Sequence, residues 1–486
     1  MRRYIYTIIL SATILTTISS CKKWLTLEPA DGIVGTKFWK TKEQLASAVN
    51  GIYASLIDKS VMEYLFAWGE LRADMIMPAS GATSADIDVY NVNLLSTNAT
   101  VNWRVVYRTI NYCNTVIDLG PSVITVDKTL TREQLDQYLS EAYAIRALMY
   151  FYLVRSFGDV PLKLTATTSD DQLEQLAKST QKDVLTQIVS DLNKAEANAV
   201  FTYNNIASDK GRITKNTVNA IQADVYLWME KYPECVTACD KIINSGRVGL
   251  VTRGRWLQMF YEGNSNESIF EFQYNAGALN SFYGMFNTSK RRYMATDAVL
   301  EDIYTVDYAN PDSTDYRADG ASIISSNNTI VKYIWNATLD ASYNHWIVYR
   351  YADILLMKAE AINQIGGRGQ EALDIVNTIR RRGHALLATE RNPGVDDQDD
   401  IADYILEERS REFAFEGKRW YDLLRNAKRD NYRRLDILLN MVVNAVPPER
   451  QQSALNKYKD YNSHYFPIYY YELQTDKNLE QNAFYK

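Results

Sequence analysis

The sequence predicts a mainly α protein of tetratricopeptide-like helical hairpins, with a second, irregular lobe that is rich in loops and carries short strands. Apolar residues recur at three- and four-residue spacing over most of the chain. The segments 216–244 and 352–381 each hold two helical patterns joined by a turn, and such hairpins must stack to bury their apolar faces. Between them, residues 246–349 change to short apolar runs separated by Gly, Asn and Ser.

Two helices of the N-terminal half have clear starts. Thr41 with Gln44, and Thr131 with Gln134, form capping boxes ahead of apolar positions at helical spacing. Between these helices, residues 77–100 contain proline, glycine and many small polar residues. We expect a long irregular loop there, and loops of this length in compact domains are usually functional.

A second candidate binding loop lies in the irregular lobe. Residues 268–273 have the pattern of a strand, and residues 274–293 follow it. In this segment Phe282, Tyr283 and Phe286 stand among polar residues and glycines and not on a periodic face. They either present rings to a ligand or fill the core from a loop.

The densest pattern is residues 405–425. Glu408, Glu412 and Glu416 recur every four residues, so they share one helical face. Spaced carboxylates could divide acid and base roles. Arginines such as Arg409 and Arg419 stand close by, and their forked guanidinium groups match carboxylates well. A structural ion-pair network that fastens the C-terminal segment is therefore the favoured interpretation, and no catalytic residue is assigned.

The N-terminus resembles a bacterial lipoprotein signal peptide. Two arginines precede an apolar stretch, and Ile18-Ser19-Ser20 leads into Cys21. From this pattern we expect residues 1–20 to be removed and Cys21 to be lipidated. Several acyl chains on one cysteine would then hold the protein at a bilayer. A plain secretory signal is the alternative.

Charge and composition exclude several classes of function. The 486-residue chain has a net charge of −6, and loss of residues 1–20 removes two arginines and no acid, giving −8. Nucleic-acid binding requires a basic surface, so this negative net charge argues against it. Cys113, Cys235 and Cys239 are an odd number for a disulfide framework. The three histidines are scattered, so we predict neither a metal nor a cofactor.

Several motifs follow one another along the chain: KKWLTLEP (22–29), NGIY (50–53), EAYAIRALMYFYLVRSFGDVPL (141–162), RYADILLMKAEAIN (350–363) and ERSREFAFEGKRWYDLLR (408–425). Taken in order, they resemble the SusD/RagB family of outer-membrane nutrient-binding lipoproteins of Bacteroidetes over nearly the whole length. The C-terminal match is looser, since Tyr469 and Phe484 replace a proline and a glycine of the family pattern.

This resemblance implies a right-handed tetratricopeptide-like scaffold at about 36–245 and 350–425. The ligand-binding lobe would span about 246–349 together with loop 77–100, and segment 426–486 would dock on the scaffold. Family members capture glycans, or peptides in some branches, for a SusC-like TonB-dependent transporter. Their sugar contacts come from loops at the positions of the two candidate loops, so the candidate ligand-binding residues are Tyr90, Asn93, Phe282, Tyr283 and Phe286.

Four functions follow as hypotheses. The first is a cell-surface lipoprotein that binds a glycan for uptake and does no chemistry, and the second is a peptide-binding member of the same family. A surface glycosidase is the third, because aromatic loops and paired carboxylates also describe those enzymes. The fourth is a purely structural scaffold for protein partners, which needs no aromatic loops.

Overall fold

The computed structural model describes residues 38–287, 289–305, 314–385 and 392–486. The predicted signal peptide and Cys21 lie outside these ranges. Within them, no helix combines the length and the apolar character that crossing a membrane requires. The protein is mainly helical, with short two-stranded sheets, as the sequence predicts.

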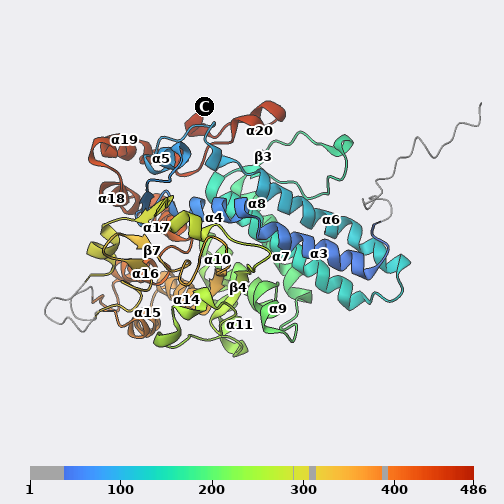
Figure 1. Ribbon diagram of the computed structural model, residues 1–486, viewed down its shortest axis with the longest axis horizontal. Helices are drawn as coiled ribbons and strands as arrows, with labels where there is room; N and C mark the ends of the chain where they lie inside the picture. Colours follow the sequence, from blue (N-terminus) through green and yellow to red (C-terminus); the bar gives the residue numbers. More distant parts are fainter. Residues whose placement is uncertain (1–37, 288, 306–313, 386–391) are drawn as a thin grey trace, which may run out of the picture.

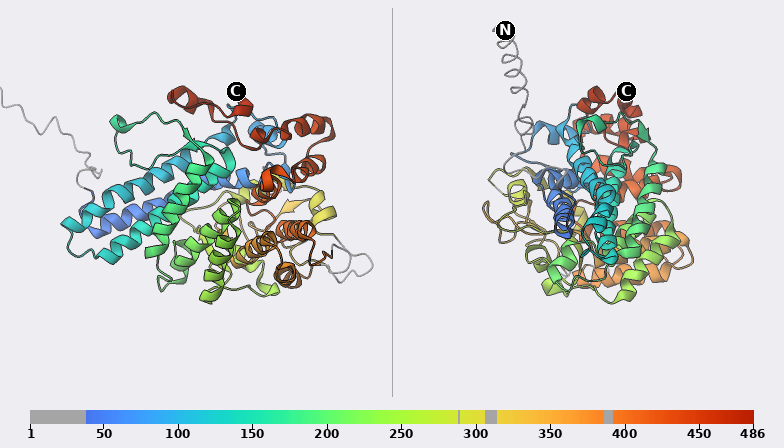
Figure 2. Two further views of the ribbon diagram at one scale, coloured as in Figure 1. Left: turned by 180° about the vertical axis from the view of Figure 1, so that it is seen from behind. Right: turned by 90° about the vertical axis from the view of Figure 1, so that its right-hand side faces the viewer.

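The scaffold is a continuous array of packed helices (Figure 1). The capping boxes at Thr41 and Thr131 are confirmed. The two predicted hairpins are confirmed as α10 with α11 and α14 with α15. Figure 2 shows α3, α6 and α7 running side by side away from the rest of the molecule. The array comprises α3 (Lys42–Leu56), α6 (Arg104–Val126), α7 (Arg132–Phe157), α8 (Gln181–Asn198), α10 (Lys215–Trp228), α11 (Tyr232–Ser245), α14 (Tyr351–Ile365), α15 (Gly369–Gly383) and α16 (Gln398–Glu412).

The second lobe is built from loops, short helices and paired strands. β4, where the sequence predicts a strand, pairs antiparallel with the buried β8. The pairs are β1 (Ile76–Pro78) with β5 (Tyr293–Ala295), β4 (Ser268–Phe272) with β8 (Trp346–Arg350), and β6 (Ile323–Ile324) with β7 (Thr329–Ile330). The lobe also holds α12 (Gln258–Tyr261), α13 (Phe282–Phe286), the 3-10 turn η3 (Arg253–Arg255) and the π-helical turn η4 (Val299–Ile303).

The expectation of a wholly irregular loop at 77–100 is wrong. The segment contains α5 (Ser84–Tyr90), which opens with a capping box between Thr83 and Asp86, and the 3-10 turn η1 (Ala99–Val101). A seven-residue helix covers only two turns, so its apolar spacing is too short to stand out in the sequence. Met77 and Pro78 end β1, and the rest of the segment is turns and irregular chain.

The C-terminal segment crosses the scaffold (Figure 1). The Phe466 amide donates to the Ser156 carbonyl at 2.8 Å, and Asn482 Nδ2 donates to the Phe157 carbonyl at 3.0 Å. It begins within α17 (Arg419–Tyr432) and contains α18 (Asp436–Ala445), α19 (Pro448–Tyr458), η5 (Tyr461–His464), α20 (Tyr470–Thr475) and η6 (Ala483–Tyr485). The remaining elements of the chain are α4 (Lys59–Glu70), β2 (Val160–Pro161), η2 (Asp170–Gln172), β3 (Lys178–Ser179) and α9 (Ile206–Gly211).

Candidate functional site

The two candidate loops, about 200 residues apart in the sequence, meet in the structure. β1 and β5 pair antiparallel, with Met77 opposite Met294. Beyond the strands, the Gly81 amide donates to the Arg291 carbonyl at 2.9 Å. A Cβ atom on Gly81 would lie 2.3 Å from the Lys290 carbonyl oxygen, so this close approach of two backbones requires glycine.

A partly buried ion pair joins the two loops to each other. Arg292 donates to both carboxylate oxygens of Asp86, at 2.7 and 2.8 Å, and to Glu63 at 3.0 Å. The Tyr293 hydroxyl donates to Asp86 at 2.8 Å. Burial alone would raise the pKa of Asp86, but the hydrogen bonds and charge of Arg292 outweigh it and hold the pKa below its ordinary value. These contacts hold the two loops in a defined arrangement.

The structure places two of the predicted ligand contacts in the core. Phe282 and Phe286 are fully buried. Phe282 stacks on Tyr333 with ring centroids 4.4 Å apart, and Phe286 meets Phe66 edge-on at 5.6 Å. The prediction that these two rings contact a ligand is therefore wrong, because a ring without exposed surface cannot touch a ligand. The alternative, that they fill the core from a loop, describes them.

The other three predicted residues reach the surface. Tyr90 is half-buried and its hydroxyl donates to the Ala445 carbonyl at 2.5 Å. Asn93 is exposed, and its backbone amide donates to the Asp88 carbonyl at 2.8 Å. Tyr283 is partly exposed at the start of α13. Their role in ligand binding stays a prediction.

Sequence reasoning missed two exposed rings on residues 333–346, a segment that is hydrogen-bonded to the segment that carries Tyr283. Trp335 and Tyr343 are 38% and 43% exposed. We call Tyr283, Trp335 and Tyr343 the aromatic loop cluster. The signal was present: residues 333–346, YIWNATLDASYNHW, alternate aromatic with small polar residues as segment 274–293 does.

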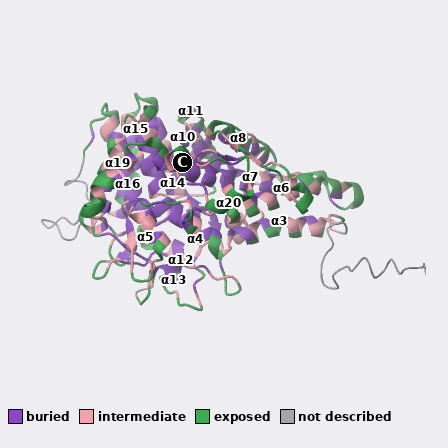
Figure 3. Cartoon of the chain, turned by 90° about the horizontal axis from the view of Figure 1, so that it is seen from above, coloured by how far each residue is buried: buried purple, intermediate pink, exposed green. Residues whose placement is uncertain are grey.

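A hydrogen-bond network joins the segments of the aromatic loop cluster. The Tyr283 amide donates to Ser342 Oγ at 3.2 Å, and Ser342 Oγ donates to Asn280 Oδ1 at 2.7 Å. Asn280 Nδ2 donates to the Asn344 carbonyl at 2.7 Å, and Asn344 Nδ2 donates to the Trp335 carbonyl at 3.2 Å. Figure 3 shows exposed and half-exposed loops around α12 and α13. The side chains of this network are buried, so the loops that carry the rings are held in place.

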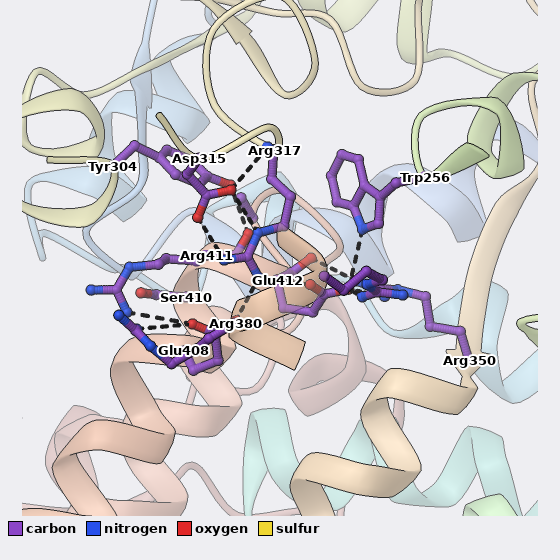
Figure 4. Close-up of polar contacts among 12 residues, drawn as sticks. Trp256, Tyr304, Asp315, Arg317, Arg350, Arg380, Glu408, Ser410, Arg411 and Glu412 are labelled. Carbon is purple, nitrogen blue, oxygen red and sulfur yellow. Dashed lines mark hydrogen bonds and ion pairs between the residues drawn. The ribbon is translucent and has the colours of Figure 1, made fainter. Parts of the chain in front are cut away.

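The carboxylates of residues 405–425 form a buried ion-pair network (Figure 4). Glu412, at the end of α16, pairs with Arg317 at 2.7 Å and with Arg350 and Arg382. Trp256 Nε1 donates to the same carboxylate at 3.2 Å. All these side chains are buried or nearly so. They come from the lobe, from the β8–α14 junction and from the end of α15.

The neighbouring carboxylates have the same character. Glu408 pairs with Arg317 at 2.5 Å, while Glu416 pairs with Lys332 at 3.0 Å and Arg350 at 2.8 Å. Burial alone would raise the pKa of Glu416, but Arg350 and Lys332 hold it below its ordinary value. A general acid needs a raised pKa and access to substrate. The network therefore has the properties of a structural element.

The expectation that Arg409 and Arg419 pair with the three glutamates is wrong. Arg409 pairs with Asp353 at 2.9 Å, and Arg419 with Asp74 at 2.7 Å. The three glutamates pair chiefly with cations of the lobe and of α15. The network thus fastens the lobe to the scaffold, where we expected it to fasten the C-terminal segment.

The described residues show no metal or disulfide chemistry. No three His, Cys, Asp or Glu side chains among them are grouped to hold a metal ion. Cys113, Cys235 and Cys239 are free and buried. Burial raises the pKa of the Cys235 thiol well above its ordinary value, which keeps it unreactive.

Comparisons with known proteins agree over both halves of the chain. The model of the SusD family matches residues 281–485, and the family model described as "Starch-binding associating with outer membrane" matches residues 23–227. SusD-like protein P38 of Formosa agariphila is 29% identical, over 85% of this chain and 89% of its own length. SusD-like protein P2 of the same organism is 26% identical, over 87% and 91%.

Solved structures share the fold. A SusD superfamily protein from Bacteroides vulgatus has a TM-score of 0.77 and 21% identity, over 92% of this chain and all of its own. A SusD superfamily protein from Bacteroides fragilis has a TM-score of 0.75 and 24% identity, with the same coverage. From its motifs, its fold and these relatives, the chain belongs to the SusD/RagB family.

Proposed function

We propose that the protein is a cell-surface lipoprotein that captures a glycan for uptake through a SusC-like TonB-dependent outer-membrane transporter. The family supports a nutrient-binding role associated with the outer membrane. Cys21 carries the lipid anchor in this proposal. The aromatic loop cluster is the single observation that carries the choice of a glycan.

The cluster suits a sugar for a physical reason. A tyrosine or tryptophan ring offers a flat apolar face with a polar edge, and it loses little conformational freedom on binding. Sugar rings have apolar faces edged with hydroxyl groups, so they match such rings. Trp335 and Tyr343 remain 38% and 43% exposed although their loops are fixed by buried hydrogen bonds.

Catalysis on the glycan is disfavoured by the placement of the carboxylates. Glycosidases need two carboxyl groups facing the scissile bond. The closely spaced carboxylates Glu408, Glu412 and Glu416 are buried and paired with cations. We therefore propose binding without cleavage.

Binding and cleavage are tested together on protein that lacks residues 1–21. The protein is run in native gels containing starch, xylan or laminarin, and each polysaccharide is also incubated with it and analysed by chromatography. We expect retardation in at least one gel and no shorter products. Release of oligosaccharides by clean protein would contradict the proposal, as would migration unaffected by every polysaccharide.

Trp335→Ala tests the cluster itself. We expect it to weaken the apparent affinity by about tenfold or more, as truncation of an aromatic anchor does. Tyr112→Ala is the matched control, because Tyr112 is 41% exposed but lies on α6, outside the cluster. If Trp335→Ala binds as the unmodified protein does, the cluster is not the glycan site. Tight binding of a peptide library with no polysaccharide binding would favour the peptide alternative.

A further inference from the structure

A groove lies beside the N-terminal end of α6, away from the aromatic loop cluster. Three distant segments form it: the start of α6, residues 161–177, which we call the strap, and α20 with the residues that follow it. Its volume is about 480 Å³, which falls within the range of small-molecule sites of roughly 300–1,000 Å³. Figure 1 shows α20 close to β3, which the strap leads into.

Hydrogen bonds fix the strap against the chain after α20. Gln175 Nε2 donates to the Thr475 carbonyl at 3.0 Å, and the Leu176 amide donates to Asp476 Oδ2 at 2.8 Å. In the other direction, the Lys477 amide donates to Gln175 Oε1 at 2.6 Å. The groove is therefore closed at this end by defined contacts between segments about 300 residues apart.

Tyr471 presents an exposed ring in the wall of the groove. The ring is 43% exposed, and the Arg104 guanidinium lies 5.3 Å from its centroid. A cation over one face of a ring favours that orientation. Trp103 is buried and also lines the groove, while Leu173 of the strap is largely exposed in it. The groove thus offers apolar surface that is held in place and exposed to solvent.

The polar lining identifies the class of ligand. Lys163 and Glu174 pair at 2.7 Å and so offset each other. Of the other charged residues that line the groove, Arg104 is positive and Glu472 and Asp476 are negative. The lining therefore carries a small net negative charge, which disfavours an anionic ligand. Side chains able to bond hydroxyl groups surround the apolar surface: Thr167, Glu472, Thr475 and Asp476.

We infer that this groove is a second oligosaccharide-binding site, in which a neutral sugar ring stacks on Tyr471 and its hydroxyls bond the threonines and acids of the rim. The inference rests on the proposed function. None of the residues that line the groove belongs to the aromatic loop cluster. Two sites on one molecule let a long polysaccharide bind at both, so moderate affinities combine into tight capture.

The test compares matched variants in native gels containing starch, xylan or laminarin. Tyr471→Ala removes the ring, and Thr475→Trp fills the groove while leaving that ring in place. Tyr112→Ala is the control, since Tyr112 and Tyr471 are 41% and 43% exposed. We expect each groove variant to lower the apparent affinity about tenfold, the Tyr471→Ala, Trp335→Ala double variant to lose retardation, and Tyr112→Ala to migrate unchanged.

The outcomes separate the two claims. If a gel retards the unmodified protein and both groove variants equally while Trp335→Ala runs free, the second site is overturned and the proposed function stands. If no gel retards the unmodified protein, both are overturned. Loss of affinity in Thr475→Trp with an unchanged melting temperature supports the groove even where Tyr471→Ala is unstable.

Discussion

Glu70 is a buried acid whose ionisation opposes folding. One carboxylate oxygen accepts the amides of Gly417 and Lys418, at 2.8 and 3.2 Å, while the other has no hydrogen-bond partner among the described residues. Burial raises the pKa of Glu70 to about 8. Gly69 beside it lets the Gly417 backbone approach, since a Cβ there would lie 1.9 Å from the Gly417 carbonyl oxygen.

This residue predicts a pH dependence with a definite sign. An unfolded glutamate loses its proton near pH 4.3, whereas folded Glu70 keeps it to about pH 8. Between these values the folded state binds more protons, so its contribution makes stability fall as pH rises. Glu70→Gln keeps an oxygen for both amides and removes the titration. We expect its melting temperature to vary less between pH 5 and 8 than that of the unmodified protein, and an identical slope would contradict this.

Phe282 and Tyr283 are neighbours with different expected roles. Phe282 is fully buried against Tyr333 and Trp346, so Phe282→Ala should cost about 3–5 kcal/mol of folding free energy. Tyr283 is partly exposed, so Tyr283→Ala should leave the melting temperature unchanged and weaken glycan binding. Denaturant unfolding and gel retardation measure the two effects. A large loss of stability in Tyr283→Ala would make that ring part of the core.

At the scale of elements, the buried network joins α16 to the lobe. Glu416→Gln leaves Lys332 and Arg350 buried with less negative charge beside them, so it should cost about 3–5 kcal/mol. Glycan affinity should stay unchanged, because no residue of the network lies in the cluster or the groove. Glu480→Gln is the control: Glu480 is exposed and pairs with Lys486, and its loss should not move the melting temperature. If Glu416→Gln is as stable as the unmodified protein but has lost glycan affinity, the network takes part in binding.

The elements also show what sequence could predict. The capping boxes at Thr41 and Thr131 and the two hairpins were predictable, because local spacing and caps determine them. The pairing of Glu416 with Lys332 was not, because the two residues are 84 positions apart and only the fold brings them together. Trp335 was missed for the same reason: its exposure depends on which loops cover it.

For the whole molecule, the proposed capture at the cell surface requires a lipid anchor, which we propose to be at Cys21, outside the described residues. We expect the unmodified protein to fractionate with outer membranes and to incorporate labelled fatty acid, and Cys21→Ala to do neither. Cys113→Ala is the control, because Cys113 is a buried thiol in α6 and its loss leaves the anchor intact. Acyl chains on Cys21 are the proposed attachment to the membrane. Cys21→Ala protein that still sediments with carbonate-washed membranes would remove the anchor from the proposal.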